Sequence, residues 1–303
     1  AFWRRQLQGF TSPTPLPGGR GGAHLNSAIE NYGGKKIGLG AEFSASLENF
    51  ARERKLTLNT IMRAAWAYLL SCYSGQRDVL FGTLVSGRSI PLEGVESIVG
   101  LFVNLVPVRA QVPLEEPIPA WLKAIQAQQA EMSQHEYCGL SQVKRWSELS
   151  GSLPLFETLM IFENWSGDLS NWNGVLEVQD CQGGQIGQGY PVTIVVEPEG
   201  GQLTLCILYD EQRIDAATAS RLLDHLRLIV EFIPSHPDAR LGDLPAMRAE
   251  ERRQLLEKWS KGHFVSPLQA PVHRLIESQA ARMPDAVAVR HADRQLTYRE
   301  LDA

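Results

Sequence analysis

Paired cysteines, a basic stripe and long apolar runs are all missing from this sequence of 303 residues. Its cysteines form no C-x-x-C pair, which indicates reduced structural thiols and is typical of a cytosolic protein; they are Cys72, Cys138, Cys181 and Cys206. No apolar run approaches the roughly 18 residues of a membrane span, so no membrane partner is expected. The net charge of −5, without a cluster of lysines and arginines, argues against nucleic acid as a partner.

Recognisable sites of common catalytic chemistry are also missing. The sequence shows no cluster of metal ligands and no serine, histidine and aspartate arrangement, so no metal is expected. The glycine-rich stretch 183–190, GGQIGQGY, looks like a phosphate-binding loop, but a strand follows it where such a loop needs a helix. This stretch is therefore predicted to be a flexible crossover.

The sequence does have the composition of a globular protein, 44% apolar and 21% charged. It begins AFWRRQLQGF, without an initiator methionine or a signal peptide, and is predicted to be the middle of a longer polypeptide. Four zones are predicted: a helix end and Pro/Gly linker over residues 1–40, alternating helices and strands over 41–235, a connector over 236–268, and the truncated start of another domain over 269–303.

Apolar periodicity predicts the helices of the main zone, at residues 43–54, 56–75, 118–135 and 215–232. Asn59 is expected to cap the second of these, and Asp215 the last. The last helix carries an apolar stripe that is expected to face inward, consisting of Leu222, Leu226, Ile229 and Ile233. A shorter amphipathic helix is predicted in the connector, at 245–259.

Nearly continuous apolar runs predict buried strands, at residues 78–85, 99–108, 155–162, 192–197 and 203–209. The last two are expected to pair antiparallel around the glycines at 200–201. Helices that alternate with strands in this way predict a two-layer α/β fold, with helices on one face of a mixed sheet.

The last thirty residues are predicted to form an amphipathic helix, a strand at 286–290, a turn at 292–294 and the start of another helix. Such a unit cannot bury its own apolar face, so it is expected to be the opening of a larger domain. Its phrases LIESQAARMPDAVAV and LTYREL closely resemble the entry to an adenylation domain of a nonribosomal peptide synthetase.

Stretches in the main zone resemble, in order, the later core motifs of condensation domains. VGLFVNLVPVR, at 99–109, is similar to the family phrase I/V-G-x-F-V-N-T-x-x-x-R. HEYCGL, at 135–140, keeps only the histidine and tyrosine of H-Q-D-Y-P-F, and LFETLMIFENW, at 155–165, resembles a P-L-F-D phrase. FWRRQLQG, at the start, resembles Y-W-R-x-x-L-x-G. The resemblance runs from residue 1 to about 235, and its order is more specific than any single phrase.

The resemblance implies a pseudo-dimer of two lobes of the chloramphenicol-acetyltransferase (CoA-dependent acyltransferase) type, with a catalytic H-H-x-x-x-D-G phrase in the first lobe. The sequence contains no such phrase, so it resembles only the second lobe. The implied function of the whole domain is to form an amide bond between a carrier-tethered acyl or peptidyl donor and an aminoacyl acceptor. The chain by itself is expected to be inactive, with the general-base histidine upstream.

The resemblance also implies which residues line the substrate tunnel or the contact between lobes: Ser86, Gly87, Arg88, Gly100, Asn104 and Arg109. Arg88 would pair with a carboxylate across the lobes or steer a carrier-bound phosphate, unless it is a solvated turn residue. Asn104 either orients the substrate or ties its strand to a loop, and an ion pair is expected for Arg109. His135 lacks the neighbouring aspartate and glycine of the family base, so catalysis by it is not expected.

The partners implied are the donor and acceptor peptidyl carrier domains, the N-terminal condensation lobe and the downstream adenylation domain. No cofactor is expected to bind directly, because the phosphopantetheine arms are delivered by the carrier domains. Three alternatives stay open: a non-catalytic docking lobe, a heterocyclisation or epimerisation relative, and a stand-alone coenzyme-A acyltransferase. The adenylation-like tail argues against the last, and also against epimerisation domains, which ordinarily close a module.

Overall fold

The computed structural model describes residues 1–16, 32–89, 92–151, 153–163, 189–259, 271–291 and 294–302. Several sequence predictions lie outside these residues, including most of the Pro/Gly linker and of the crossover at 183–190, and the context of Cys181. The chain divides into two compact units, Ala1–Arg248 and Ala249–Ala303, and each is described by itself.

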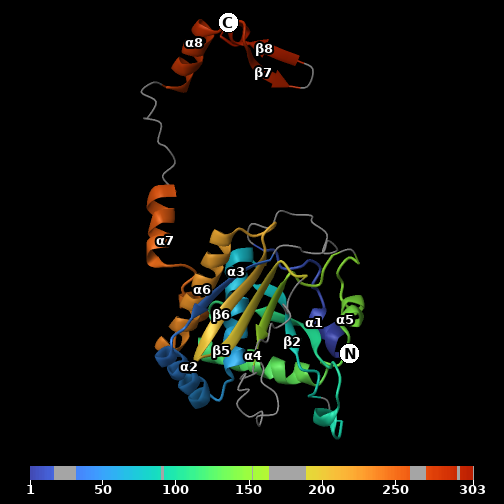
Figure 1. Cartoon of the computed structure of the whole chain (residues 1–303). Helices are drawn as coiled ribbons and strands as arrows, with labels where there is room; N and C mark the ends of the chain where they lie inside the picture. The colour runs from blue at the N-terminus through green and yellow to red at the C-terminus, as the bar shows by residue number, and fades with distance from the viewer. Residues whose placement is uncertain are drawn as a thin grey trace. The chain divides into compact units, whose positions relative to one another are not determined.

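A six-stranded mixed sheet, in the order β1-β6-β5-β4-β2-β3, organises the first unit (Figure 1). Its strands are β1 (Tyr32–Gly38), β2 (Asp78–Val85), β3 (Asn104–Gln111), β4 (Thr158–Phe162), β5 (Val192–Glu199) and β6 (Gln202–Asp210). β4 runs parallel to β2 and β5, and the other neighbouring strands are antiparallel. One end of the sheet therefore contains the ends of β2 and β4 and the start of β3.

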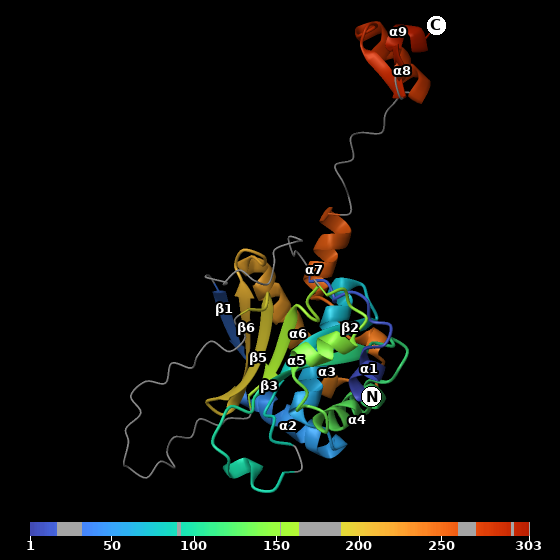
Figure 2. The same cartoon turned by 90° about the vertical axis from the view of Figure 1, so that its right-hand side faces the viewer.

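Helices α2 (Ala41–Arg54), α3 (Leu58–Ser74) and α6 (Ala216–Ser235) cover one face of this sheet (Figures 1 and 2). α3 is buried on nearly all sides because it packs against α6, β2, β4 and α4 (Ile118–Ser133). The unit also contains α1 (Phe2–Leu7) and α5 (Leu140–Trp146), which pack against each other. This is the two-layer α/β arrangement that the sequence predicts.

The caps of the two long helices test the sequence predictions directly. Asp215 caps α6 as predicted, because Oδ1 accepts from the backbone nitrogens of Ala217 and Thr218 at 2.9 and 2.8 Å. The predicted stripe of α6 is buried as well. The cap predicted for α3 is wrong: Thr57, not Asn59, is the N-cap, and its Oγ1 accepts from the backbone nitrogen of Thr60 at 3.0 Å.

The strand predicted at 99–108 is wrong over its first half. β3 begins at Asn104, which pairs with Val85, the last residue of β2, so residues 99–103 have no strand beside them. β4 likewise begins at Thr158 rather than at residue 155, because its pairing with β5 starts there. β1 is not predicted by the sequence at all. Its residues, YGGKKIG, have little β propensity and form a strand because all of them pair with β6.

Strand β3 lies at the edge of the sheet, and side chains of α4 bind its outer carbonyl groups. Gln128 Nε2 donates to the carbonyl oxygen of Arg109 at 2.7 Å, and Trp121 Nε1 donates to that of Gln111 at 2.7 Å. Pro107, also in β3, has no N–H to offer. The edge therefore presents few free groups to another strand.

The second unit begins with α7 (Ala249–Gln254), which continues as a π-helical turn over Leu255–Trp259. The helix predicted at 245–259 thus starts four residues later than expected. α8 (Val272–Arg282) precedes a hairpin of β7 (Val287–His291) and β8 (Arg294–Thr297), and α9 (Tyr298–Leu301) follows; β8 is not among the predicted strands. In the described part of the chain, no helix is both long and apolar enough to span a membrane.

Candidate functional site

The connection from β2 to β3 projects apolar side chains into solvent. We call its described residues, 86–89 and 92–103, the exposed loop. Val99 is 99% exposed and Leu101 is 91% exposed. The other large apolar residues that the loop exposes are Leu92, Ile98 and Val103. Exposed apolar residues gathered in one loop are typical of a surface that another part of a protein covers.

Arg88 organises the exposed loop from within. Its guanidinium donates to the carbonyl oxygen of Val95, and Nη2 donates to those of Ile98 and Gly100 at 3.1 and 3.4 Å. The same group lies 4.3 Å from the centre of the Phe102 ring, a cation–π contact. Arg88 thus binds the loop itself, and a partner for it outside this chain stays a prediction.

Gly87 allows the two ends of the exposed loop to approach each other. Its φ is +68°, and a β-carbon there would lie 2.0 Å from the carbonyl oxygen of Phe102. Any other residue would clash, so only glycine allows this close backbone approach. The neighbouring Ser86 is exposed, and its Oγ accepts from the backbone nitrogen of Arg88 at 3.3 Å.

Asn104 fastens the far end of the exposed loop to the segment after α4. Its Nδ2 donates to the carbonyl oxygens of Glu136 and Cys138 at 2.6 and 2.9 Å, and its Oδ1 accepts from the backbone nitrogen of Leu105 at 2.9 Å. Both ends of the amide group are therefore bonded inside the chain. These contacts favour the interpretation of Asn104 as a tie between strand and loop.

Two buried charges that are not among the predicted site residues lie in the same unit, and one of them binds this loop. Glu136 is 3% exposed and accepts from the backbone nitrogen of Ser89 at 3.2 Å. Arg63, on α3, is 4% exposed and donates to Thr83 Oγ1 at 3.1 Å. Burial lowers the pKa of Arg63 to about 10, and the charge of Glu136 opposes this shift. The one signal in the sequence is a single arginine in the otherwise apolar run IMRAAWAYLL.

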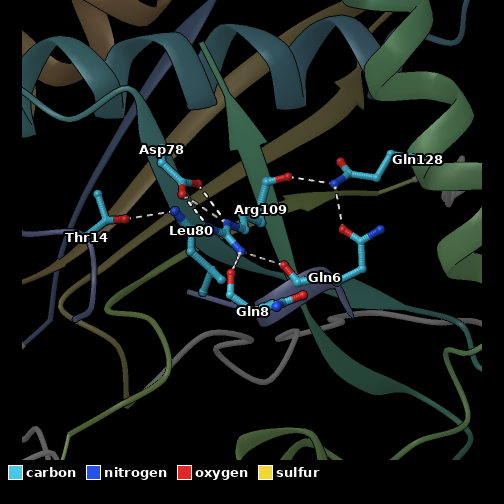
Figure 3. A network of polar contacts seen from close by, with 7 residues as sticks. All are labelled: Gln6, Gln8, Thr14, Asp78, Leu80, Arg109 and Gln128. Atoms are coloured by element: carbon cyan, nitrogen blue, oxygen red, sulfur yellow. Dashed lines mark hydrogen bonds and ion pairs between the residues drawn. The ribbon is translucent and has the colours of Figure 1, made fainter. Parts of the chain in front are cut away.

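Arg109 stands at the centre of a separate network (Figure 3). Its Nε and Nη2 bind Asp78 at 2.9 and 2.5 Å, and Nη1 donates to the carbonyl oxygens of Gln6 and Gln8 at 2.9 and 2.7 Å. The hydrogen bonds to Asp78 raise the pKa of Arg109. A planar guanidinium suits this task because it donates in several directions at once. Arg109 therefore joins the N-terminal segment to β2 and β3.

The structure thus divides the six predicted site residues into two groups. Five lie in the exposed loop or at its ends: Ser86, Gly87, Arg88, Gly100 and Asn104. Arg109 lies toward the opposite end of the β2–β3 pair, where its register partner is Leu80. The ion pair expected for Arg109 is present, and its partner, Asp78, belongs to the same unit. A contact of Arg109 with another lobe stays a prediction.

His135 packs against the N-terminal helix. Its ring stacks on that of Phe2 with centroids 4.5 Å apart, and its carbonyl oxygen accepts from Trp3 Nε1 at 3.2 Å. These contacts favour a packing role, in line with the expectation that His135 is not catalytic. The described residues contain no group of three or more His, Cys, Asp or Glu side chains placed to hold a metal ion.

An open cleft of about 550 Å³ lies at the start of α3. Thr57 and Asn59 line it from α3, Gln126 and Gln129 from α4, and Phe162 from the end of β4. Among the described residues, no charged side chain takes part in its lining. Because β2 and β4 are parallel, this cleft lies at the same end of the sheet as the exposed loop.

Comparisons with known proteins place this fold in a family. The chain is 37% identical to one of the proteins that make up the linear gramicidin synthase of Brevibacillus parabrevis, over 305 residues, which covers 100% of the chain and 6% of that protein. It is 36% identical to chondramide synthase cmdD of Chondromyces crocatus over 272 residues, 87% of the chain and 7% of that protein. The chain therefore spans a small part of the length of these curated relatives.

A solved structure shares the fold. A four-domain nonribosomal peptide synthetase, crystallised in its holo form with AMP and glycine, matches 99% of this chain and 24% of its own length, with a TM-score of 0.70 and 19% identity. The family model of the condensation domain matches residues 1–256. The predicted chloramphenicol-acetyltransferase-like α/β fold is thus confirmed, and the chain belongs to the condensation domain family of nonribosomal peptide synthetases.

Proposed function

We propose that this chain supplies the C-terminal, acceptor-side lobe of a condensation domain. The whole domain would join a carrier-tethered acyl or peptidyl donor to a carrier-tethered aminoacyl acceptor. The amine nitrogen attacks the carbonyl carbon of the donor thioester, a C–N bond forms, the C–S bond breaks, and the amine proton passes through a base to the leaving thiol. The match of the family model to residues 1–256 carries this proposal.

Two observations support the assignment to one lobe. The X-domain of teicoplanin biosynthesis matches 80% of this chain and only 56% of its own length, with a TM-score of 0.66 and 20% identity, so its fold extends well beyond the match. The sequence also has no H-H-x-x-x-D-G phrase. We infer that the catalytic histidine and the first lobe belong to the polypeptide upstream of Ala1.

In this function, the exposed loop lines the substrate tunnel and contacts the first lobe. Its apolar side chains would be covered there, which removes their contact with water. Arg88 and Asn104 would act by shaping the tunnel wall, because carbonyl groups of this chain already occupy their donors. The hydroxyl proton of Ser86 is the group best placed to meet a substrate, because Ser86 is exposed and its Oγ acts as the acceptor in its bond with the Arg88 nitrogen.

The remaining zones would connect this lobe to the next domain. We propose that residues 236–268 link the condensation domain to an adenylation domain, which begins within 269–303. The phosphopantetheine arms of the donor and acceptor carrier domains would enter the tunnel from either side. We propose a cytoplasmic location, which the scattered cysteines without a C-x-x-C pair support.

Reconstitution with the upstream sequence tests the function. The isolated chain is expected to form no dipeptidyl product from loaded donor and acceptor carriers, because it lacks the base. A polypeptide extended upstream through the first lobe is expected to form it. Product from the isolated chain above a no-protein control would contradict the one-lobe assignment and direct attention to His135. An extended polypeptide that forms no product would favour a non-catalytic docking lobe.

A further inference from the structure

Both ends of the exposed loop bind the same short segment, residues 136–138. Near the start of the loop, the backbone nitrogen of Ser89 donates to Glu136 Oε1 at 3.2 Å. At its end, Asn104 Nδ2 donates to the carbonyl oxygens of Glu136 and Cys138 at 2.6 and 2.9 Å. The position of the loop relative to the sheet therefore depends on where Glu136 is held.

Glu136 needs compensation for its charge because its side chain is 3% exposed. A buried carboxylate is costly unless an opposite charge or several hydrogen bonds stabilise it. The one hydrogen bond described for this carboxylate comes from Ser89. Arg63, in the second turn of α3, supplies the opposite charge and is 4% exposed. The charge of Arg63 therefore helps to stabilise Glu136 in its buried position.

Arg63 depends on Glu136 in return. Its Nη2 donates to Thr83 Oγ1 at 3.1 Å, whereas Nε and Nη1 are buried and have no hydrogen-bond partner among the described residues. The described contacts include no hydrogen bond or ion pair between Arg63 and Glu136. The charge of Glu136 acts on Arg63 over a longer distance and opposes the effect of burial on the pKa of Arg63. Each is thus too poorly hydrogen-bonded to be stable in the interior without the other.

We propose that Arg63 and Glu136 act together as positioning residues, whose opposite buried charges hold the exposed loop in the arrangement that lines a condensation tunnel. Both side chains are too deeply buried to touch a substrate. Their effect passes through Ser89 and Asn104 to the loop that carries Ser86. The role of the loop in a tunnel rests on the proposed function, whereas the position of the loop rests on contacts within this chain.

Hydrogen–deuterium exchange on this chain tests the hold on the loop with two variants. Arg63→Met keeps an unbranched side chain but leaves the charge of Glu136 uncompensated. Amide exchange in residues 86–89 and 92–103 is then expected to accelerate about tenfold. In the double variant Arg63→Met/Glu136→Gln, the amide oxygen still accepts from Ser89 and needs no opposite charge. Most of the wild-type protection is expected to return.

The control is Arg248→Met, which breaks an exposed ion pair with Asp224 and is expected to leave exchange in the loop unchanged. Exchange at the wild-type rate in Arg63→Met would overturn the proposal, and so would a double variant that exchanges as fast as the single one. If Arg63→Met unfolds the whole chain, a folded double variant with a protected loop supports the coupling of charges. A double variant that is equally unfolded contradicts it.

Turnover in the full synthetase tests the connection to the tunnel. The kcat/KM of condensation is expected to fall in Arg63→Met and to recover in the double variant, in step with exchange in the loop. Loop exchange that responds while kcat/KM stays constant would overturn the tunnel part of the proposal. A wild-type synthetase without condensation activity would contradict the proposed function and leave the exchange result as the test of the loop.

Discussion

Asn104 Nδ2 lies 2.6 Å from the carbonyl oxygen of Glu136, a residue 32 positions further along the chain. This bond, with a second one to Cys138, joins the start of β3 to the segment that follows α4. The removal of either bond would leave a carbonyl group without its partner inside the protein. The amide of Asn104 therefore stabilises the fold at the point where the exposed loop ends.

Asn104→Ala is expected to lower the free energy of unfolding by about 1–3 kcal/mol, because the carbonyl groups of Glu136 and Cys138 lose their donor. Urea unfolding of the isolated chain measures this change. In the complete parent domain, we expect the condensation rate to fall as well, at a temperature where the variant is folded. A rate equal to wild type would remove Asn104 from the site and leave it a purely structural residue.

Arg88→Ala is expected to loosen the exposed loop and lower the condensation rate of the parent domain while leaving the fold of this unit intact. Its guanidinium binds carbonyl groups within the loop and contributes little to the core, so the melting temperature of the isolated chain should change little. Arg88→Lys serves as the matched variant, because one ammonium cannot reach all three carbonyls. Full activity in both variants would contradict a role for Arg88 in the tunnel wall.

Arg109→Lys is expected to destabilise the chain by about 1–3 kcal/mol in urea unfolding, because lysine cannot bind Asp78 and the carbonyls of Gln6 and Gln8 together. Arg5→Lys is the control within the same N-terminal segment. The exposed pair of Arg5 with Glu131 should contribute less than about 1 kcal/mol. Equal losses in the two variants would show that Arg109 is no more than a surface ion pair.

Glu163→Gln is expected to make stability less dependent on pH. Burial, and then repulsion from Glu197, raise the pKa of Glu163 above the ordinary value of 4.5. The folded protein therefore resists ionisation of this carboxyl, and the penalty grows as pH rises from the ordinary pKa to the raised one. Solvent screening keeps the gain in stability from glutamine small at pH 7, and no gain is expected below about pH 4. Thermal unfolding at both pH values measures it, and an equal gain under the acidic condition would contradict this cause.

Limited proteolysis is expected to remove the second unit first and leave a fragment that ends near Arg248. The second unit exposes much of its apolar surface, with Val272 at 70% and Met283 at 51%. Burial therefore offsets little of the entropy lost in ordering it. Mass spectrometry of the early fragments identifies the cuts. Early cuts inside the six-stranded sheet, with residues 249–303 intact, would contradict this order.

The sequence predicts those elements whose own residues carry the pattern of a buried helix or strand. α6 with its Asp215 cap and β2 with its continuous apolar run follow from local rules. β1 could not be predicted, because YGGKKIG becomes a strand only through its pairing with β6, more than 160 residues away. Residues 99–103 mislead the prediction for the opposite reason, because their apolar side chains face outward from a loop.

For the site, five of the six predicted residues lie at the exposed loop and Arg109 does not, and the sequence does not predict what holds the loop. The need for glycine at position 87 is visible in the turn Ser86-Gly87-Arg88. The bonds from Asn104 and Ser89 to residues 136–138 are not, because they join segments whose distance in space is set by the packing of α4. The role of Arg63 cannot be predicted for the same reason. The sequence shows an arginine within an apolar helix but not the residues that lie near it in the fold.

The bonds from α4 to the outer edge of β3 have a consequence for the assembly of a long polypeptide. An open strand edge is a template for pairing with another copy, and a tether raises the local concentration of neighbouring segments. Gln128 and Trp121 occupy two carbonyl groups of that edge, and Pro107 removes one N–H. Two copies of this unit, on one ribosome-bound chain or on adjacent chains, would have little means to aggregate through this edge while they fold.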